Sequence, residues 1–417
     1  AHAGRLLDLS PVTALDAYLY DVRVRLSMPG TVDEQVVIVD LDEKSLAEVG
    51  RWPWGRHVIA ELVQRLTDDY KVKVIGFDVV FVEPDESSGL KVLEEIGRRQ
   101  LKGEAGFHRV LQDLRPGLDY DQIFAQTLRG RPVVLGYYFS GQESAQQTGV
   151  LPVPAFPAGS FAGLHVPFVS WQGYGANLPV LQAAATSAGH FNPLVDFDGS
   201  SRRVPMLVEF QGAYYESLSL AVVRTLLGNT ELKPGIPEGS QSIEWLDVIS
   251  GQGRLRIPVD EHVAALVPYR GHERSFPYVS AVDVLKGRIS KDQLADRVVL
   301  IGTTAPGLMD LRSTPVGAAF PGVEVHANLI AGMLSGGLRE KPGYVLGIDV
   351  MQIIFFGCML TVLIPLLPPF RATLLAIVSL GVILGLNLWL WNSALLVLPL
   401  AASVLLVFML YALNMSW

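Results

Sequence analysis

Charge almost disappears from this sequence after Gly343, and that feature constrains the fold most. Of the 74 charged residues (33 Lys and Arg plus 41 Asp and Glu), only Asp349 and Arg371 follow it. Three stretches of this tail are each about 20 mostly apolar residues long, which is the length needed to cross the hydrocarbon core of a bilayer. We therefore predict a soluble domain over residues 1–343, followed by three transmembrane helices at residues 344–367, 372–391 and 394–413.

The basic residue of the tail predicts how the chain lies across the membrane. Arg371 is in the short linker between the first two spans, and basic linkers favour the cytoplasm. Residues 1–343 are then extracytoplasmic. Such a location requires a membrane helix ahead of Ala1, which we expect to have been trimmed or lost. Asp349 and Gln352 are costly in lipid, so we expect both to face another helix.

Composition and cysteine content exclude several classes of function. A net charge of −8 and a pI near 5.5 provide no electrostatic footprint for nucleic acid. Cys358 is the only cysteine and lies in the first apolar span, so the soluble part has no disulfide and no thiol nucleophile. Neither a Ser-His-Asp order nor a Cys-His pairing can be argued. We therefore predict no catalytic residue in this chain.

Apolar strands alternate with helices in the soluble part. Residues 35–41 (QVVIVDL) and 73–82 (KVIGFDVVFV) have the composition of buried strands, and residues 42–49 and 57–66 between them have helical patterns. This βαβ order predicts two parallel strands and an α/β fold. Further strands are predicted at residues 132–138, 255–258, 264–269 and 297–301, and further helices at residues 9–26, 218–227, 279–285 and 321–335.

Two segments have a different character. Residues 140–175 are rich in Gly, Pro, Gln and Ser, which predicts a long surface insert and a candidate source of specificity. Residues 189–210 contain two apolar runs on either side of Asp198-Gly199, a turn signal for a β-hairpin. The run from Asp196 to Ser200 also resembles the start of a calcium loop, although the bidentate Glu that ends such a loop is missing.

Carboxylates gather after the two central strands. Asp40 and Asp42 follow the first strand, and Asp78, Glu83 and Asp85 follow the second. If the two strands are parallel neighbours, these acids converge on the edge where ligands bind in open sheets. We predict a ligand site there, with Asp40, Asp78 and Asp85 as the ligands of a divalent cation such as Ca²⁺ or Mg²⁺. The alternative is structural, with the acids capping helices and pairing with Arg51, Arg56 or Arg312.

Residues from two loops extend this predicted site. Trp52 and Trp54 are predicted to line an aromatic pocket, although packing in the core is the more common fate of tryptophan. Arg56, in the same loop, is a further predicted ligand residue. The small residues at 302–310 leave backbone N–H groups free to hold an anion, or form a plain tight loop. Asp310 and Thr314 join the ligand site if the strand at 297–301 lies beside the other two.

Glu324 and His326 form a further motif near the start of the last soluble helix. They are two residues apart and do not share a helical face, and no HExxH sequence is present. We therefore predict that His326 is structural, bonded to a backbone carbonyl, and that it binds no zinc.

Five motifs in this order resemble a known family, the second type of CHASE domain, found in the extracytoplasmic sensors of cyclases and histidine kinases. They are VDLDEKSLAEVGRWPWGR, VIGFDVVFVEPD, GHFNPLVDFDGSSRRVP, RVVLIGTTAPGLMDLRSTP and PGVEVHAN, within residues 10–335. The resemblance implies one membrane helix before the domain, about three after it, and then a cytoplasmic output domain. That output is most often a class III nucleotide cyclase, and otherwise a histidine or serine/threonine kinase. The resemblance implies no particular ligand.

These patterns support the hypothesis of a sensory and membrane region of a bacterial receptor, with an adenylate or guanylate cyclase as its output. An extracytoplasmic ligand, ion or protein partner would bind near the acids, and the helix at 321–335 would pass the change to the spans. A homodimer is expected if the output is a cyclase. The alternatives are a scaffolding protein of the cell envelope, for which the 140–175 insert is suited, and an extracytoplasmic hydrolase using two carboxylates.

Overall fold

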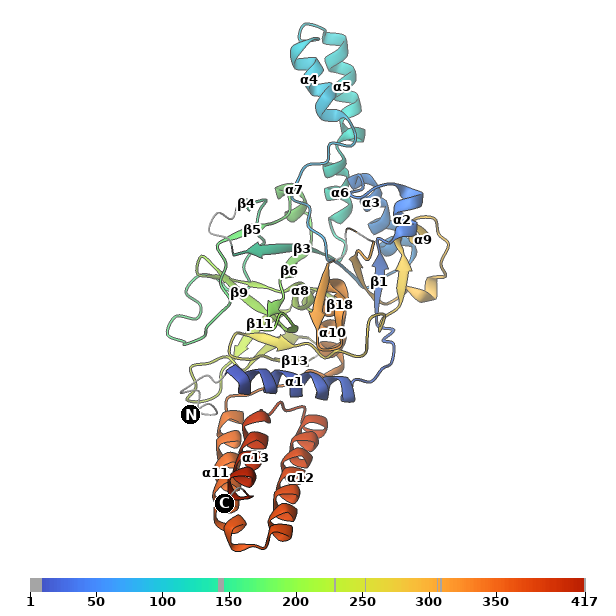
Figure 1. Cartoon of the computed structure of the whole chain (residues 1–417). Coiled ribbons are helices and arrows are strands. Elements are labelled where there is room, and N and C mark those ends of the chain that lie inside the picture. Colours follow the sequence, from blue (N-terminus) through green and yellow to red (C-terminus); the bar gives the residue numbers. More distant parts are fainter. Residues whose placement is uncertain are drawn as a thin grey trace.

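The computed structural model describes residues 10–141, 146–228, 230–251, 253–305, 307 and 310–415. Figure 1 shows an α/β body with a helical hairpin at one end and a bundle of long helices at the other. The body contains a mostly parallel sheet, and the long apolar helices come after it in the chain. This arrangement confirms the fold class predicted from the sequence.

The central sheet is built from six parallel strands. Their order is β15 (Tyr278–Ser280), β1 (Val36–Asp40), β16 (Val298–Gly302), β2 (Val74–Phe77) and β3 (Val133–Ser140), with β6 (Ser187–His190) also paired to β3. We expected β1 and β2 to be neighbours, and this was wrong, because β16 lies between them and pairs with both. A strand from far along the chain therefore completes the centre of the sheet.

Helices cover both faces of the sheet, and the strands alternate between them. Val36 and Ile38 of β1 face the core that contains α8 (Leu218–Leu226) and α10 (Gly322–Ser335). Val37 and Val39 face the opposite core. Its helices are α2 (Glu43–Val49), α3 (Arg56–Gln64), α6 (Tyr120–Leu128) and α9 (Ala281–Leu285). With both faces covered, every residue of β1 is buried.

A glycine sets how closely α8 approaches the sheet. A Cβ atom on Gly76 would lie 2.7 Å from Cγ2 of Val222 and 2.8 Å from Cδ2 of Leu300. Any larger residue would therefore push α8 away from β2, because neither contact can accommodate the extra methyl group.

Short antiparallel sheets complete the body. The predicted hairpin at Asp198-Gly199 is confirmed, because β7 and β8 pair on either side of it and Gly199 has a φ of +81°. The strands are β7 (Leu194–Val195), β8 (Ser201–Pro205), β9 (Leu207–Phe210), β10 (Ala213–Glu216), β11 (Glu231–Gly235), β12 (Trp245–Ser250), β13 (Gly253–Pro258), β14 (Ala264–Leu266), β17 (Leu311–Thr314) and β18 (Gly317–Pro321). The remaining short helical turns are η1 (Arg65–Asp69), α7 (Pro179–Gln182) and η2 (Lys291–Gln293).

Most described residues of the predicted surface insert at 140–175 are exposed or half-buried, and strand pairing and aromatic contacts attach the segment to the body. The insert contributes β4 (Gln147–Thr148) and β5 (Gly173–Gly175) to the edge of the main sheet. Phe161 is buried, and its ring lies 4.6 Å from that of Tyr214 in β10. Aromatic packing therefore holds a segment whose composition indicated a loop. Residues 142–145 of the insert are outside the described part of the chain.

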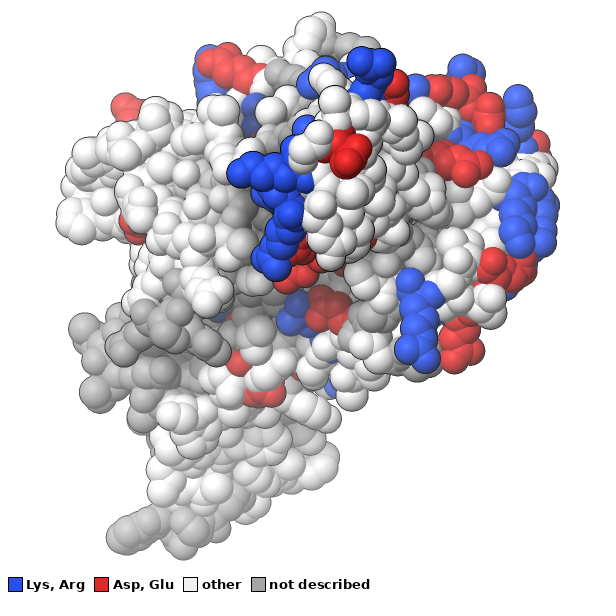
Figure 2. Space-filling view, turned by 90° about the horizontal axis from the view of Figure 1, so that it is seen from above, with Lys and Arg blue, Asp and Glu red and all other residues white. Residues whose placement is uncertain are grey.

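A helical hairpin projects from the body at the end away from the long apolar helices (Figure 1). It consists of α4 (Leu90–Arg99) and α5 (Ala105–Leu118), joined across their length by an ion pair of 3.0 Å between Glu94 and Arg115. Figure 2, seen from this end, shows acidic and basic side chains interleaved on the surface.

The apolar tail forms α11 (Val345–Leu363), the short turn η3 (Ile364–Leu366), α12 (Pro369–Ser393) and α13 (Ala401–Met415). The segments Val345–Leu366 and Pro369–Ser393 are long and apolar enough to cross a membrane, whereas α13 is a shorter apolar helix. The third span was predicted from residue 394, but its helix begins at residue 401, because residues 394–400 before it form no helix and include Pro399. These helices indicate a membrane protein.

The polar residues of the tail face inward, as predicted. Asp349 is 3% exposed, and the side-chain amide of Gln352 donates to Ser403 of α13 over 2.8 Å.

The helix α1 (Ser10–Ser27) lies across the junction between the body and the bundle (Figure 1). It confirms the helix predicted at residues 9–26, of which residue 9 is not described. Tyr20 and Val24 are buried in the core shared with α8 and α10, so α1 is part of the body's packing.

Candidate functional site

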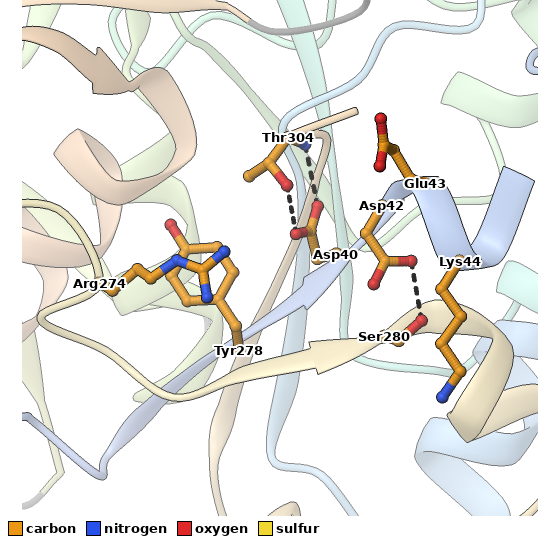
Figure 3. A pocket seen from close by; sticks show the side chains of 8 residues that line it. All are labelled: Asp40, Asp42, Glu43, Lys44, Arg274, Tyr278, Ser280 and Thr304. Atoms are coloured by element: carbon orange, nitrogen blue, oxygen red, sulfur yellow. Dashed lines mark hydrogen bonds between the residues drawn. The ribbon is translucent and has the colours of Figure 1, made fainter. Parts of the chain in front are cut away.

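An open polar cavity of about 500 Å³ lies at the carboxyl ends of β15, β1 and β16. This is the edge at which ligands bind in open parallel sheets. Two of the predicted ligand residues, Asp40 and Asp42, line it. The complete lining is Asp40, Asp42, Glu43, Lys44, Arg274, Tyr278, Ser280 and Thr304 (Figure 3).

Asp40, the last residue of β1, forms the floor of the cavity. Its side chain is 5% exposed and accepts two hydrogen bonds from Thr304, one from the backbone N–H at 2.9 Å and one from the hydroxyl at 2.5 Å. Burial raises the pKa of Asp40, and the two bonds from Thr304 oppose that rise. Asp40 therefore links β1 firmly to the loop that follows β16.

Asp42 combines a structural task with exposure to the cavity. Its Oδ1 atom accepts from the backbone N–H of Ser45 at 2.8 Å, which caps α2, and from the hydroxyl of Ser280 at 2.8 Å. Its Oδ2 atom forms no hydrogen bond with any residue in the described ranges. The capping alternative is therefore observed for Asp42, yet half of the carboxylate still faces the cavity.

The opposite wall is a loop that a buried carboxylate holds in place. Oε2 and Oε1 of Glu324 accept from the backbone N–H groups of Arg274 and Ser275 at 2.9 and 2.6 Å, and Oε2 also accepts from the hydroxyl of Tyr278 at 3.0 Å. These bonds fix Arg274 at a φ of +65°. The Arg274 guanidinium lies over the Tyr278 ring, 5.7 Å from its centroid. Burial, followed by the charge of Glu324, raises the pKa of Tyr278.

A second group of acids lies beside β2, outside this cavity. Burial raises the pKa of Asp78 to about 7, and the nearby charge of Asp310 adds to the rise. Asp310 itself pairs with Arg312 at 2.6 Å, so Arg312 serves an acid other than the five for which the structural alternative proposed it. Asp310 therefore lies near Asp78, as expected if β16 lay beside β2. Neither residue lines the cavity. Residues 306, 308 and 309 of the predicted anion loop are outside the described residues.

The remaining predicted acids hold the loop between β2 and the hairpin. Asp85 accepts from the backbone N–H of Arg56 at the start of α3, at 2.5 Å, and from that of Ser87 at 2.7 Å. The Arg56 guanidinium donates to the carbonyl oxygen of Glu83 at 3.2 Å and lies over the Phe81 ring. Asp85 therefore has the capping role of the alternative interpretation, whereas Arg56 contacts the main-chain carbonyl of Glu83 and not its carboxylate.

Three other residues predicted to bind the ligand, Trp52, Trp54 and Thr314, take part in local packing instead. Trp54 is buried, donates to the carbonyl of Gly50 at 2.8 Å and meets Trp52 edge-on with centroids 5.8 Å apart. The Thr314 hydroxyl donates to the carbonyl of Gly317 at 2.9 Å within the β17–β18 turn. None of the three lines the cavity.

The structure does not gather the predicted metal ligands Asp40, Asp78 and Asp85. Within the described residues, no group of three or more His, Cys, Asp or Glu side chains could hold a metal ion. The calcium-like run at Asp196–Ser200 is occupied by a cation of the chain itself. Arg202 pairs with Asp196 at 2.9 Å and with Asp198 at 2.6 Å.

Glu324 and His326 have structural roles. Glu324 anchors the Arg274 loop. His326 is 3% exposed, burial lowers its pKa to about 4, and it shares a hydrogen bond with the backbone of Phe191. This agrees with the predicted structural histidine.

The sequence interpretation missed the Arg274 wall of the cavity. Residues 279–285 were predicted to be one helix, whereas residues 278–280 form β15 and only residues 281–285 are helical. The signal was present, because Ser280 stands directly before the apolar run AVDVL, at the position of a helix N-cap. That boundary would have revealed a strand end beside Asp40.

A family model matches most of the chain. The family model described as the CHASE2 domain matches residues 3–364. No curated protein and no solved structure matches the chain.

Proposed function

The chain belongs to the CHASE2 domain family, a sensory domain typical of signalling receptors, and from this premise we propose that it is the sensory and membrane region of a bacterial transmembrane receptor. We propose a class III adenylate or guanylate cyclase as the output. The support for a cyclase is the frequency of that output in the family. The support for sensing is the cavity at the edge of the sheet.

In this proposal the sensory site is the cavity beside Asp40 and Asp42. The observation that carries it is the placement of the cavity across three strand ends and the loop after β16. A ligand that contacts Thr304 or Arg274 shifts elements that also contact α10, because Glu324 of α10 holds the Arg274 loop. Binding would thereby favour one of two arrangements of the body.

The route to the membrane in this proposal is α1 as well as the predicted helix α10. On the body side, Arg202 of β8 pairs with Asp21 of α1 at 2.7 Å. On the membrane side, Asp16 accepts from the backbone N–H groups of Leu400 and Ala401 at 2.8 Å each, directly at the start of α13. A tilt of α1 would therefore move the last helix of the bundle.

Orientation and assembly complete the proposal. Residues 1–343 are extracytoplasmic, and the three apolar helices cross the inner membrane with the Arg371 linker in the cytoplasm. The receptor is a homodimer, because the active site of a class III cyclase lies between two catalytic domains.

A reporter fusion tests the sensory role. The whole chain is joined to a class III cyclase domain in a bacterium that lacks its own cyclase, and cyclic nucleotide is measured. We expect Asp42→Asn and Arg274→Gln to change the output by about threefold or more, whereas Glu104→Gln on the projecting hairpin leaves it unchanged. Equal output from all four chains at equal expression would contradict the proposal.

Cysteine labelling tests the orientation. In a Cys358→Ala background, Gln112→Cys on α5 should react with a membrane-impermeant maleimide in cells with a permeabilised outer envelope and an intact inner membrane. Reaction only after the inner membrane is opened would place the body in the cytoplasm.

A further inference from the structure

The cavity beside Asp40 has walls of opposite charge. Figure 3 shows Arg274 on one side and Asp42 and Glu43 on the other, with Asp40 and Thr304 between them. The opposite charges do not neutralise each other, because the Arg274 guanidinium forms no ion pair with Asp42 or Glu43 across the cavity.

The acidic wall has carboxylate oxygens to spare. Oδ2 of Asp42 and the exposed carboxylate of Glu43 make no hydrogen bond or ion pair with the described residues of the chain. Lys44 cannot neutralise them, because its ammonium is bound to Asp283 at 2.6 Å.

The basic wall has a guanidinium without a carboxylate partner. Burial raises the pKa of Asp40, and the charge of Arg274 is among the influences that oppose this rise. Arg274 nevertheless forms no ion pair with any residue that the structure describes. Its backbone is held by Glu324 and its guanidinium by the Tyr278 ring, so the position of its charge is fixed before any ligand arrives. Fixed charges bind with less loss of entropy than mobile ones.

From these walls we infer that the cavity takes a small zwitterion, with its ammonium against Asp42 and Glu43 and its carboxylate on Arg274. The inference rests on the proposed sensory role of the same cavity and names the class of ligand. A free amino acid has this chemistry, and a cavity of about 500 Å³ has ample room for one.

The charges argue against ligands of a single sign. An anion that reached Arg274 would face the two acids across the cavity, and a cation at the acids would face Arg274. A zwitterion satisfies both walls at once, and a charge-assisted hydrogen bond at each end adds to its affinity.

Calorimetry on the full chain in lipid nanodiscs tests this inference. The probes are glycine, β-alanine and 4-aminobutyrate, which separate the two charges by increasing lengths, with acetate, methylammonium, Ca²⁺ and Mg²⁺ as single-sign comparisons. We expect at least one zwitterion to bind more tightly than every single-sign probe. Asp42→Asn and Arg274→Gln should each weaken it by about tenfold or more. Asn still caps α2, so the first variant should fold.

Matched control variants and a second measurement, amide hydrogen exchange, distinguish failure of the ligand class from failure of the sensory role. Glu104→Gln and Arg109→Gln, which remove the same charges from the projecting hairpin, should leave affinity unchanged. Amide hydrogen exchange reports binding at residues 272–278 and signalling at α1. A zwitterion that protects only residues 272–278 supports the ligand class and contradicts the sensory role. The inference is overturned if none of the three zwitterions binds, or if acetate or methylammonium binds as tightly as the best zwitterion. In that case the sensory role would stand only if acetate or methylammonium also protects the amides of α1.

Discussion

Asp40, at the end of β1, and Asp78, directly after β2, lie in different environments at the same edge of the sheet. Asp40 is buried but receives two hydrogen bonds from Thr304. Asp78 is half-buried, and its carboxylate accepts no hydrogen bond from the described residues. Burial, and after it the nearby charge of Asp310, disfavours the ionised form of this carboxylate and raises the pKa of Asp78 to about 7.

The raised pKa of Asp78 predicts a pH-dependent stability. The folded protein holds a proton that the unfolded chain releases near 3.8, so stability is lost as the pH rises from about 4 to about 7. Asp78→Asn removes that loss and should stabilise the protein at pH 8 by about 1–2 kcal/mol, after allowance for solvent screening. The difference should vanish towards pH 4. Thermal unfolding across this range, with Asp113→Asn on the exposed hairpin as the control, measures it. A difference that is independent of pH would contradict the titration.

At the scale of elements, one arginine joins a hairpin to a helix. The guanidinium of Arg202 in β8 meets three carboxylates, Asp196 and Asp198 of the hairpin and Asp21 of α1. Arg202 is only 5% exposed, so these charges depend on one another for their neutralisation. Hydrogen bonding to Arg202 lowers the pKa of Asp198.

Removing this arginine should therefore loosen α1. Arg202→Gln leaves three acids without their cation, and we expect a loss of about 3–5 kcal/mol in the free energy of unfolding. Adding Asp21→Asn to that variant should recover part of the loss, because one uncompensated charge disappears. Urea unfolding followed by circular dichroism measures both. A loss of under about 1 kcal/mol, or no recovery in the double variant, would show that the cluster does not hold α1.

At the scale of the whole molecule, α1 also joins the body to the membrane helices. Trp391 of α12 is fully buried, with the guanidinium groups of Arg23 and Arg339 at 4.8 and 4.2 Å from its ring. Arg23 also donates to Asn387 at 2.6 Å and to the carbonyl of Leu398 at 3.0 Å. This polar junction is the place where movement of the body would reach the bundle.

Arg23→Met should weaken the junction and leave the body intact. We expect the amides of α1 to exchange about tenfold faster or more, because a buried charged hydrogen bond is lost. The strands β1 and β16 should keep their protection. Hydrogen exchange followed by mass spectrometry in nanodiscs measures both regions, and Arg109→Met makes the same chemical change on the exposed hairpin. Unchanged exchange in α1 would remove Arg23 from the route to the membrane.

The sequence by itself determined the features that depend on neighbours along the chain. Strand composition located β1, β2, β3 and β16, an Asp-Gly turn located one hairpin, and the loss of charge after Gly343 located the apolar helices. Asp42 was predictable as an N-cap for the same reason. Each of these features depends on a pattern of apolar residues, or on a hydrogen bond, that spans only a few residues.

Only the tertiary structure decided which of these elements meet. The position of β16 between β1 and β2 separates Asp40 from Asp78. One wall of the cavity comes from the Arg274 loop, which is more than 200 residues from Asp40 in the sequence. The packing of residues 156–168 against β10 could not be predicted either, because the composition of this segment is typical of a loop. The physical reason is that burial and ion pairing between distant segments are set by the whole core, and no local pattern records the partner.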